Sequence, residues 1–350
     1  MKKKTQVRNL ILIIVAFVLL ICGYLVLMKS TATDDTEEET EDSFVVTTVE
    51  ESDIQKIIYT IDDTEIELDL KGEEWVTPTD ETCPVNEYTV DAMLSVLKEV
   101  KATRKIKKKD IDVESFGLEV PEKVIHFTLK DGTEMTYTLG ALNSVVDKYY
   151  FQMSGDENVY MIDTTMYNTF DYDLLELAEV EEYPSIGNQD IADFQVTMDG
   201  KTLYFVDVKD AAHKKNDSEI PKCVWKYGED KDNLKKVDST YAEELIQAII
   251  GLTNAECVTY NKTEKDVKKC GLDQPSMTLV VNYTKMQTSE TEETEDSTEV
   301  ADAEIIDESY TVYVGGVDEE SGEYYVNMEG SDAIYTMNVA NIDTIKKAFE

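Results

Sequence analysis

The sequence predicts an α+β protein in which two tandem, diverged repeats follow one N-terminal transmembrane helix. Three observations predict this class. An uncharged apolar stretch lies near the N-terminus. Two later segments alternate apolar and polar residues around a turn, as β-hairpins do, and residues with helical periodicity follow each of them. The same order of motifs then recurs in the second half of the chain. We therefore expect each repeat to be a mostly antiparallel sheet with helices packed on one face.

The first expected element is a membrane anchor at residues 10–28. This segment, LILIIVAFVLLICGYLVLM, has no charged side chain. At about 1.5 Å per residue it spans about 28 Å, close to the hydrocarbon thickness of a bilayer. Residues 1–9 carry four basic and no acidic side chains, which predicts a cytoplasmic N-terminus. We expect a single-pass cell-membrane protein whose C-terminal bulk is extracytoplasmic.

Two alternatives for this segment stay open. A cleaved signal peptide would need a site with small residues, for which Ser30, Thr31 and Ala32 are a weak match. A lipoprotein signal would modify Cys22, but the bulky Ile21 precedes it. The length of the apolar run favours the uncleaved helix.

An acidic linker is predicted at residues 29–50. Its segment 31–43 holds seven acidic and no basic residues, which favours an extended, self-repelling stalk. The whole chain has 350 residues and a formal net charge of −41. Because this charge repels the phosphates of nucleic acids, we expect no nucleic-acid partner.

The first repeat is predicted over residues 51–180. Alternating residues on both sides of Asp62 and Asp63 predict a hairpin, which the lone Trp75 follows. A helix is expected next, with apolar residues at helical spacing: Val90, Met93, Leu94, Leu97 and Val100. A Gly-Leu-x-x-Pro motif at 117–121 predicts a tight entry into the following strands. A helix at about 164–170 ends the repeat.

The second repeat is predicted over residues 190–350. It has a hairpin around Asp199 and Gly200, the lone Trp225, and a helix for which Thr240 and Glu243 predict a capping box. The Gly-Leu-x-x-Pro motif returns at 271–275, and a helix at about 339–349 ends the repeat.

Insertions distinguish the second repeat from the first. The offset between matching residues grows from 137 (Asp53 to Asp190) to 175 (Tyr149 to Tyr324). The largest insertion, at residues 288–309, has ten acidic and no basic side chains and is predicted to be an exposed, disordered loop.

The sequence contains no set of residues arranged for catalysis. His126 and His213 are its two histidines, and neither has a cysteine or carboxylate at the spacing of a catalytic or zinc site. Residues 230–233 begin like an EF-hand loop but lack the glycine of its turn. We assign no catalytic, cofactor-binding or metal-binding residue, and we expect a non-enzymatic protein without a cofactor.

The cysteines leave the redox state open. Cys22 lies in the predicted transmembrane helix. The other four are expected outside the cytoplasm, where disulfides persist: Cys83, Cys223, Cys257 and Cys270. Three pairings of these four are possible, and a fully reduced state is equally compatible with the sequence.

The first repeat resembles the bacterial domain-of-unknown-function 4340 family. The resemblance rests on the hairpin, Trp75, the helix, the motif at 116–121 and the segment from Tyr149 to Tyr160. It covers residues 54–170 well and returns more weakly over 191–349. The chain departs from that pattern in its acidic insertion and in Cys270, where the first copy has an aromatic residue. The resemblance implies an N-terminally anchored envelope protein whose gene often neighbours ATP-binding-cassette (ABC) transporter genes. The family has no agreed catalytic residues to carry over.

These observations support two main hypotheses of function. The first is an accessory or scaffold component of an ABC-type transport or envelope complex, with membrane proteins such as a transporter permease as partners. The second is an independent cell-envelope module that binds a glycan or peptide through some of its 20 tyrosines. A hydrolase with a pair of carboxylates is the least favoured hypothesis, because no motif supports it.

Overall fold

The computed structural model describes residues 43–61, 64–107, 109, 114–208, 224–287 and 304–349. The chain divides into two compact units, one with residues up to Glu50, Val96–Glu122 and Tyr137–Thr165, the other with Glu51–Ser95, Lys123–Thr136 and Met166 onward. The predicted transmembrane helix and most of the acidic linker lie outside the described residues. Within the described part, no helix is both long and apolar enough to cross a membrane.

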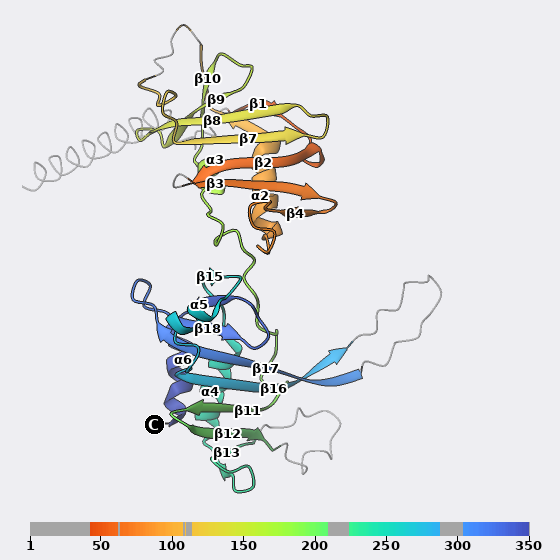
Figure 1. Cartoon of the computed structure of the whole chain (residues 1–350), viewed down its shortest axis with the longest axis vertical. Helices are drawn as coiled ribbons and strands as arrows, with labels where there is room; N and C mark the ends of the chain where they lie inside the picture. Colours follow the sequence, from red (N-terminus) through yellow and green to blue (C-terminus); the bar gives the residue numbers. More distant parts are fainter. Residues whose placement is uncertain are drawn as a thin grey trace, which may run out of the picture. The chain divides into compact units, whose positions relative to one another are not determined.

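An eight-stranded sheet contains most strands of the first repeat (Figure 1). Its strands are β2 (Ile54–Ile61), β3 (Thr64–Lys71), β4 (Glu74–Val76), β6 (Arg104–Ile106), β7 (Lys123–Leu129), β8 (Glu134–Asn143), β9 (Lys148–Met153) and β10 (Val159–Ile162). They lie in the order β4-β3-β2-β7-β8-β9-β10-β6. The predicted hairpin is confirmed, since β2 and β3 pair antiparallel from Lys56 and Asp69 to Ile61 and Thr64.

Two helices and a small sheet accompany these strands. Helix α2 (Glu87–Lys98) buries the predicted apolar positions from Val90 to Leu97, whereas Val100 lies in the next strand. That strand, β5 (Glu99–Ala102), pairs with β1 (Phe44–Thr48) in a two-stranded sheet. The 3-10 turn η1 (Glu51–Asp53) leads into β2, and α3 (Thr165–Thr169) follows β10. The prediction that residues 29–50 are all linker is therefore wrong for 44–48.

A nine-stranded sheet contains the strands of the second repeat. These are β11 (Ile191–Met198), β12 (Lys201–Asp207), β13 (Trp225–Gly228), β14 (Lys235–Lys236), β15 (Cys257–Thr259), β16 (Met277–Gln287), β17 (Glu304–Val317), β18 (Tyr324–Met328) and β19 (Ile334–Met337). Their order is β14-β13-β12-β11-β16-β17-β18-β19-β15. It repeats the order of the eight-stranded sheet strand for strand and adds only the edge strand β14. Two sheets with one topology are what a duplicated sequence requires.

The core of this sheet is built on aromatic packing. Phe194 and Phe205 come from paired strands and stack with their ring centroids 4.6 Å apart. Trp225 packs at 5.5 Å from Phe194 and is buried. Helix α4 (Ser239–Ile250) covers these side chains with Leu245 and Ile249.

The helix starts of the second repeat differ from the prediction. Asp238 is the N-cap of α4, because its side chain accepts hydrogen bonds from the backbone amides of Thr240 (3.0 Å) and Tyr241 (3.3 Å). The capping box predicted at Thr240 and Glu243 is therefore wrong. A capping box does occur at α5 (Glu264–Lys269), between Thr263 and Asp266. The last helical elements are α6 (Val339–Lys346) and the 3-10 turn η4 (Lys347–Phe349).

The predicted α+β architecture with packed helices is wrong. Antiparallel strands in three sheets dominate the described residues. The helices are few and short, from five residues in α3 to twelve in α2 and α4. The helical periodicity in the sequence is confined to short segments, and in the described part of the chain these form single helices between strands.

The acidic insertion is shorter than predicted at its C-terminal end. Residues 304–309 begin β17 and pair with residues 282–287 of β16. The prediction of a disordered loop is wrong for these six residues, whereas residues 288–303 lie outside the described part. Cys22, His213 and Cys223 also fall outside it.

Candidate functional site

The Gly-Leu-x-x-Pro turns form the same contact in both repeats. In the first, the amide of Ala141 donates a 2.8 Å hydrogen bond to the carbonyl of Phe116. In the second, the amide of Gly316 donates a 2.8 Å bond to the carbonyl of Cys270. Each turn thus attaches to a bulge in the second strand after it, β8 or β17, where the pairing register shifts after Leu139 and after Val314.

Glycine is required at these contacts. A Cβ atom on Gly140 would lie 2.1 Å from the Phe116 carbonyl oxygen, and one on Gly315 would lie 2.1 Å from that of Cys270. The turn glycine of the first repeat, Gly117, has φ +67°, a conformation that costs other residues energy. The motif therefore has a structural role in holding the turn to the sheet.

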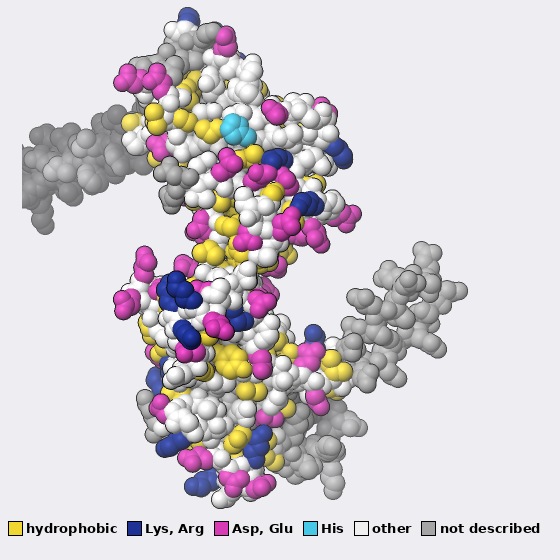
Figure 2. Space-filling model, in the orientation of Figure 1, with side chains coloured by type: hydrophobic (Ala, Val, Ile, Leu, Met, Phe, Trp, Pro, Cys, Tyr) yellow, Lys and Arg dark blue, Asp and Glu magenta, His cyan; other side chains and the backbone are white. Residues whose placement is uncertain are grey.

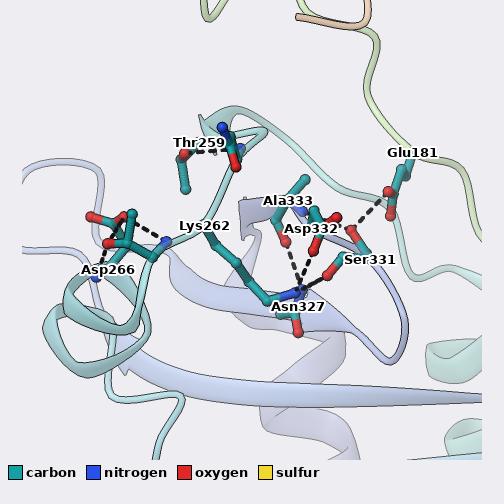
Figure 3. Close-up of polar contacts among 10 residues, drawn as sticks. Glu181, Thr259, Lys262, Asp266, Asn327, Ser331, Asp332 and Ala333 are labelled. Atoms are coloured by element: carbon teal, nitrogen blue, oxygen red, sulfur yellow. Dashed lines mark hydrogen bonds and ion pairs between the residues drawn. The ribbon is translucent and has the colours of Figure 1, made fainter. Parts of the chain in front are cut away.

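A polar cluster in the second repeat ties together three segments (Figure 3). The Lys262 amine donates to the carbonyl of Ser331 and lies 3.7 Å from a carboxylate oxygen of Asp332. The Ser331 hydroxyl donates to Glu181 over 2.7 Å. Asn327 donates to the carbonyls of Ser331 (3.2 Å) and Ala333 (2.6 Å). The turn between β18 and β19 is thereby fixed to the chain before α5 and to the extended segment around Glu181.

This cluster has the chemistry of a structural network. The Ser331 hydroxyl also accepts from the amide of Ala333 (2.9 Å), so both its donor and an acceptor site are used within the fold. A serine nucleophile needs a general base such as histidine. The one histidine among the described residues, His126, is an exposed residue of β7 whose Nδ1 lies 2.9 Å from the Thr136 hydroxyl.

A buried lysine in the first repeat was not predicted. The Lys123 side chain is 3% exposed, and its amine donates to the carbonyl of Phe170 (2.6 Å) and to the carboxylate of Asp171 (2.7 Å). The amine also lies 4.4 Å from the ring centroid of Tyr167. Lys123 thus holds the end of α3 to β7. In the second repeat, Met277 occupies the matching position at the start of β16. Aligning the two repeats shows this difference, but it does not indicate that Lys123 is buried.

The structure gives no metal-binding geometry to the residues considered from the sequence. Residues 230–233 form a turn between β13 and β14, in which the Asp230 side chain accepts from the amide of Asp232 (3.0 Å). Among the described residues, no group of three or more histidine, cysteine and acidic side chains is placed to hold a metal ion. Acidic side chains are spread over the visible face of the molecule (Figure 2).

The described cysteines are free thiols. Cys83 and Cys270 are buried and Cys257 is half-buried, and none of the three is in a disulfide. A bond between Cys257 and Cys270, which the sequence allowed, is therefore not formed. Burial raises the pKa of both Cys83 and Cys257 to about 11. At neutral pH these thiols are protonated and poor nucleophiles.

Tyrosines of the described strands mostly contribute to packing. Tyr59 and Tyr137 are fully buried and pack edge-on against Phe170 and Phe151, with centroids 5.3 and 5.1 Å apart. Among the described tyrosines, Tyr88 has the largest exposed fraction, 87%. This packing weakens the hypothesis of a tyrosine-lined groove along the strands.

Hollows on the described second repeat and on the segment before it include the following two. One, of about 490 Å³, lies along α4 and α6 and is lined by Tyr241, Glu243, Gln247, Asn341 and Lys347 among others. The other, of about 530 Å³, is lined by residues 180–186, Ile250 and residues 252–254. The first combines an aromatic ring with amide and charged groups, which is a lining suited to a polar ligand.

The fold and its polar clusters define a class: a protein of two topologically equivalent antiparallel modules whose polar clusters hold turns and strands together. The family model described as Domain of unknown function (DUF4340) matches residues 75–275 and, in a second overlapping match, residues 225–350. The chain belongs to this family. Both matches begin at a tryptophan, Trp75 and Trp225, which the repeats also align. No curated protein and no solved structure matches the chain.

Proposed function

We propose that this protein is a membrane-anchored, extracytoplasmic and non-enzymatic component of an ABC-type transport or envelope complex, in which it serves as an accessory or scaffold subunit. The observation that carries the proposal is the strand-for-strand repetition of one antiparallel module in a single chain. Two similar modules on one chain offer two related binding surfaces, and linked surfaces raise the effective concentration for a common partner. The apolar segment 10–28 and its basic flank supply the anchor.

The polar groups described above support a scaffold rather than a catalyst. The Ser331 hydroxyl, the Lys262 amine and the buried Lys123 amine all bind groups of the fold itself. Catalytic groups instead direct their donors and acceptors toward a substrate position.

An envelope-binding module is the second candidate. The hollow along α4 and α6 favours it, because Tyr241 and the neighbouring amide and carboxylate groups are of the kind that bind a glycan or peptide. Replacing Gln247 by Ala should then weaken binding of purified envelope glycan to the full chain, as measured by calorimetry. Equal binding by both proteins, or none by either, would count against this candidate.

The proposal is tested by extraction of the full chain from native membranes with a mild detergent. We expect a transporter permease to be recovered with it in fixed proportion. An unrelated single-pass protein with the same tag is the control for chance recovery. Recovery of the chain alone under conditions that keep other membrane complexes intact would contradict the proposal.

Topology is tested separately with a cysteine at Val145, which is 90% exposed in the turn between β8 and β9. In Val145→Cys, a maleimide that cannot cross the membrane should label intact cells above the level of the wild type. Labelling that requires permeabilised cells would contradict the extracytoplasmic placement.

A further inference from the structure

The second repeat has an extension that the first lacks. Strands β16 and β17 have 11 and 14 residues, whereas their counterparts β7 and β8 have 7 and 10. Four residue pairs, from Thr284 with Asp307 to Gln287 with Glu304, continue beyond the last residue that β11 pairs, Tyr283. We call residues 284–287 and 304–309 the arm; it projects as a two-stranded ribbon from the nine-stranded sheet (Figure 1).

The arm has a free backbone edge among the described residues. Strand β18 pairs with β17 only from Val312 onward, and the amide of Glu329 reaches Thr311. Within the described part of the chain, residues 304–310 thus pair with β16 on one side and with no strand on the other. Unpaired strand edges bind other strands unless charge or shape prevents it.

The side chains of the arm combine exposed apolar surface with negative charge. Met286 and Ile305 face each other as a cross-strand pair and are 71% and 64% exposed. Asp307 is exposed nearby, and Lys285 is the one basic residue of the arm. In the first repeat, a tight turn at Asp131 and Gly132 joins the corresponding strands. The apolar pair therefore belongs to an added feature and not to the shared core.

The negative charge of the chain favours a cationic partner at this edge. The chain carries a net charge of −41, and residues 288–309 include ten acidic and no basic side chains. A second copy of the chain and an anionic membrane surface are both repelled by such a field, whereas a cationic segment is attracted.

We propose that the arm is a docking site for one lysine- or arginine-rich extended segment of a partner protein. The segment adds as a strand to the free edge at residues 304–310 and packs apolar side chains on Met286 and Ile305. This inference rests on the proposed function, because it names the surface by which the scaffold binds its partner.

A peptide probe tests strand addition on the full chain in detergent. The probe is a fluorescein-labelled heptapeptide of alternating lysine and valine, and its binding is measured by anisotropy. Its matched control carries N-methyl groups on alternate amides, which keep charge and side chains but remove strand donors. We expect the control to bind at least about tenfold more weakly, a change equivalent to about 1.4 kcal/mol. Equal affinity of the two peptides would overturn strand addition.

A substitution separates apolar contact from charge. Ile305→Asp should weaken probe binding about tenfold through loss of apolar burial. Because the substitution adds negative charge, binding by charge alone would instead become stronger, and that result would overturn the proposal. Val145→Asp, at an exposed apolar residue outside the arm, is the matched control and should leave affinity unchanged.

Photo-crosslinking in native membranes identifies the occupant. A photoreactive residue at 305 should crosslink to a protein segment that mass spectrometry shows to be basic, and the same residue at 145 should not. Crosslinks from 305 to a second copy or to lipid would overturn the inference. Recovery of the complex with crosslinks only outside the arm would refute the inference and leave the proposed function standing. Absence of any complex would refute both.

Discussion

Alanine at Gly140 or Gly315 is predicted to destabilise the sheet that contains it, and by a similar amount in both repeats. A Cβ atom at either position would lie 2.1 Å from a backbone carbonyl oxygen of the Gly-Leu-x-x-Pro turn. Since Cβ atoms essentially never approach within 3.0 Å, turn and strand must separate by about 0.9 Å. The hydrogen bonds at these contacts, from Ala141 and Gly316, are then lost or strained.

The size of the effect follows from two terms. Overpacking against backbone costs about 1–3 kcal/mol. Loss of the hydrogen bond between the turn and the strand costs about 0.5–1.5 kcal/mol more, because the amide of Ala141 is half-buried and that of Gly316 is exposed. We expect each substitution to lower the free energy of unfolding by about 1.5–4.5 kcal/mol, a large fraction of the stability of a typical domain. Gly187→Ala is the control, because its Cβ would meet only a side-chain oxygen of Asp190 at 3.3 Å.

Urea unfolding followed by tryptophan fluorescence measures the two sheets separately. Trp75 lies in the first sheet and Trp225 in the second, so Trp225→Phe leaves a reporter of the first and Trp75→Phe one of the second. Each glycine variant is compared with its own single-tryptophan parent. A change below about 0.5 kcal/mol in either sheet would refute the role assigned to these glycines, because surface substitutions typically have effects of that size.

Three further predictions concern single side chains. Lys123→Met should lower the free energy of unfolding in urea by less than about 2 kcal/mol, and Lys123→Ala should lower it by more. Methionine keeps the packing and loses only the amine bonds to Phe170 and Asp171. The reverse order of the two variants would contradict this prediction. Hydrogen bonds from Tyr325 and Ser321 lower the pKa of Asp318 from 3.8 to about 2. The stabilisation by these bonds is complete above pH 4 and is lost as the pH falls to about 2. Asp318→Asn should therefore flatten the dependence of Tm on pH in this window. A slope equal to that of the wild type would argue against these bonds. Because burial raises the pKa of Cys257 from 9.0 to about 11, a variant retaining this cysteine alone should react with a thiol reagent at pH 8 about a hundredfold more slowly folded than in urea; equal rates would show an accessible thiolate.

The strands were predictable from the sequence where local pattern determines them. Alternation around Asp62 and around Asp199 indicated the two hairpins, and the spacing from Val90 to Leu97 indicated α2. These features depend on residues within one element. The Gly-Leu-x-x-Pro motif was identified as a turn for the same reason, because glycine and proline restrict the local backbone.

Features that depend on distant partners were not predictable. The amide that holds each turn is distant in sequence from the carbonyl it binds: Ala141 lies 25 residues after Phe116, and Gly316 lies 46 residues after Cys270. Strand β1 was hidden in an acidic segment, because its pairing with β5 brings together residues about fifty positions apart. Residues 304–309 have the composition of a loop, yet they form a strand because β16 pairs with them.

The residues of the candidate site come together only through tertiary structure. Burial of Lys123 requires the end of α3 to pass over the start of β7, which no local pattern indicates. Glu181, Lys262 and Ser331 come from three separate segments and meet only in the folded second repeat. The acidic composition of the arm is visible in the sequence. Its free edge follows only from the order of strands in the sheet.

We propose that this chain acts as a subunit of a membrane complex. The most direct test is the mass of the particles that contain it, measured by native mass spectrometry after release from membranes in polymer-bounded lipid discs. We predict a particle that contains the 39.7 kDa chain together with a transporter permease in fixed stoichiometry. Particles that contain the chain alone, while known complexes from the same membranes remain whole, would contradict this role.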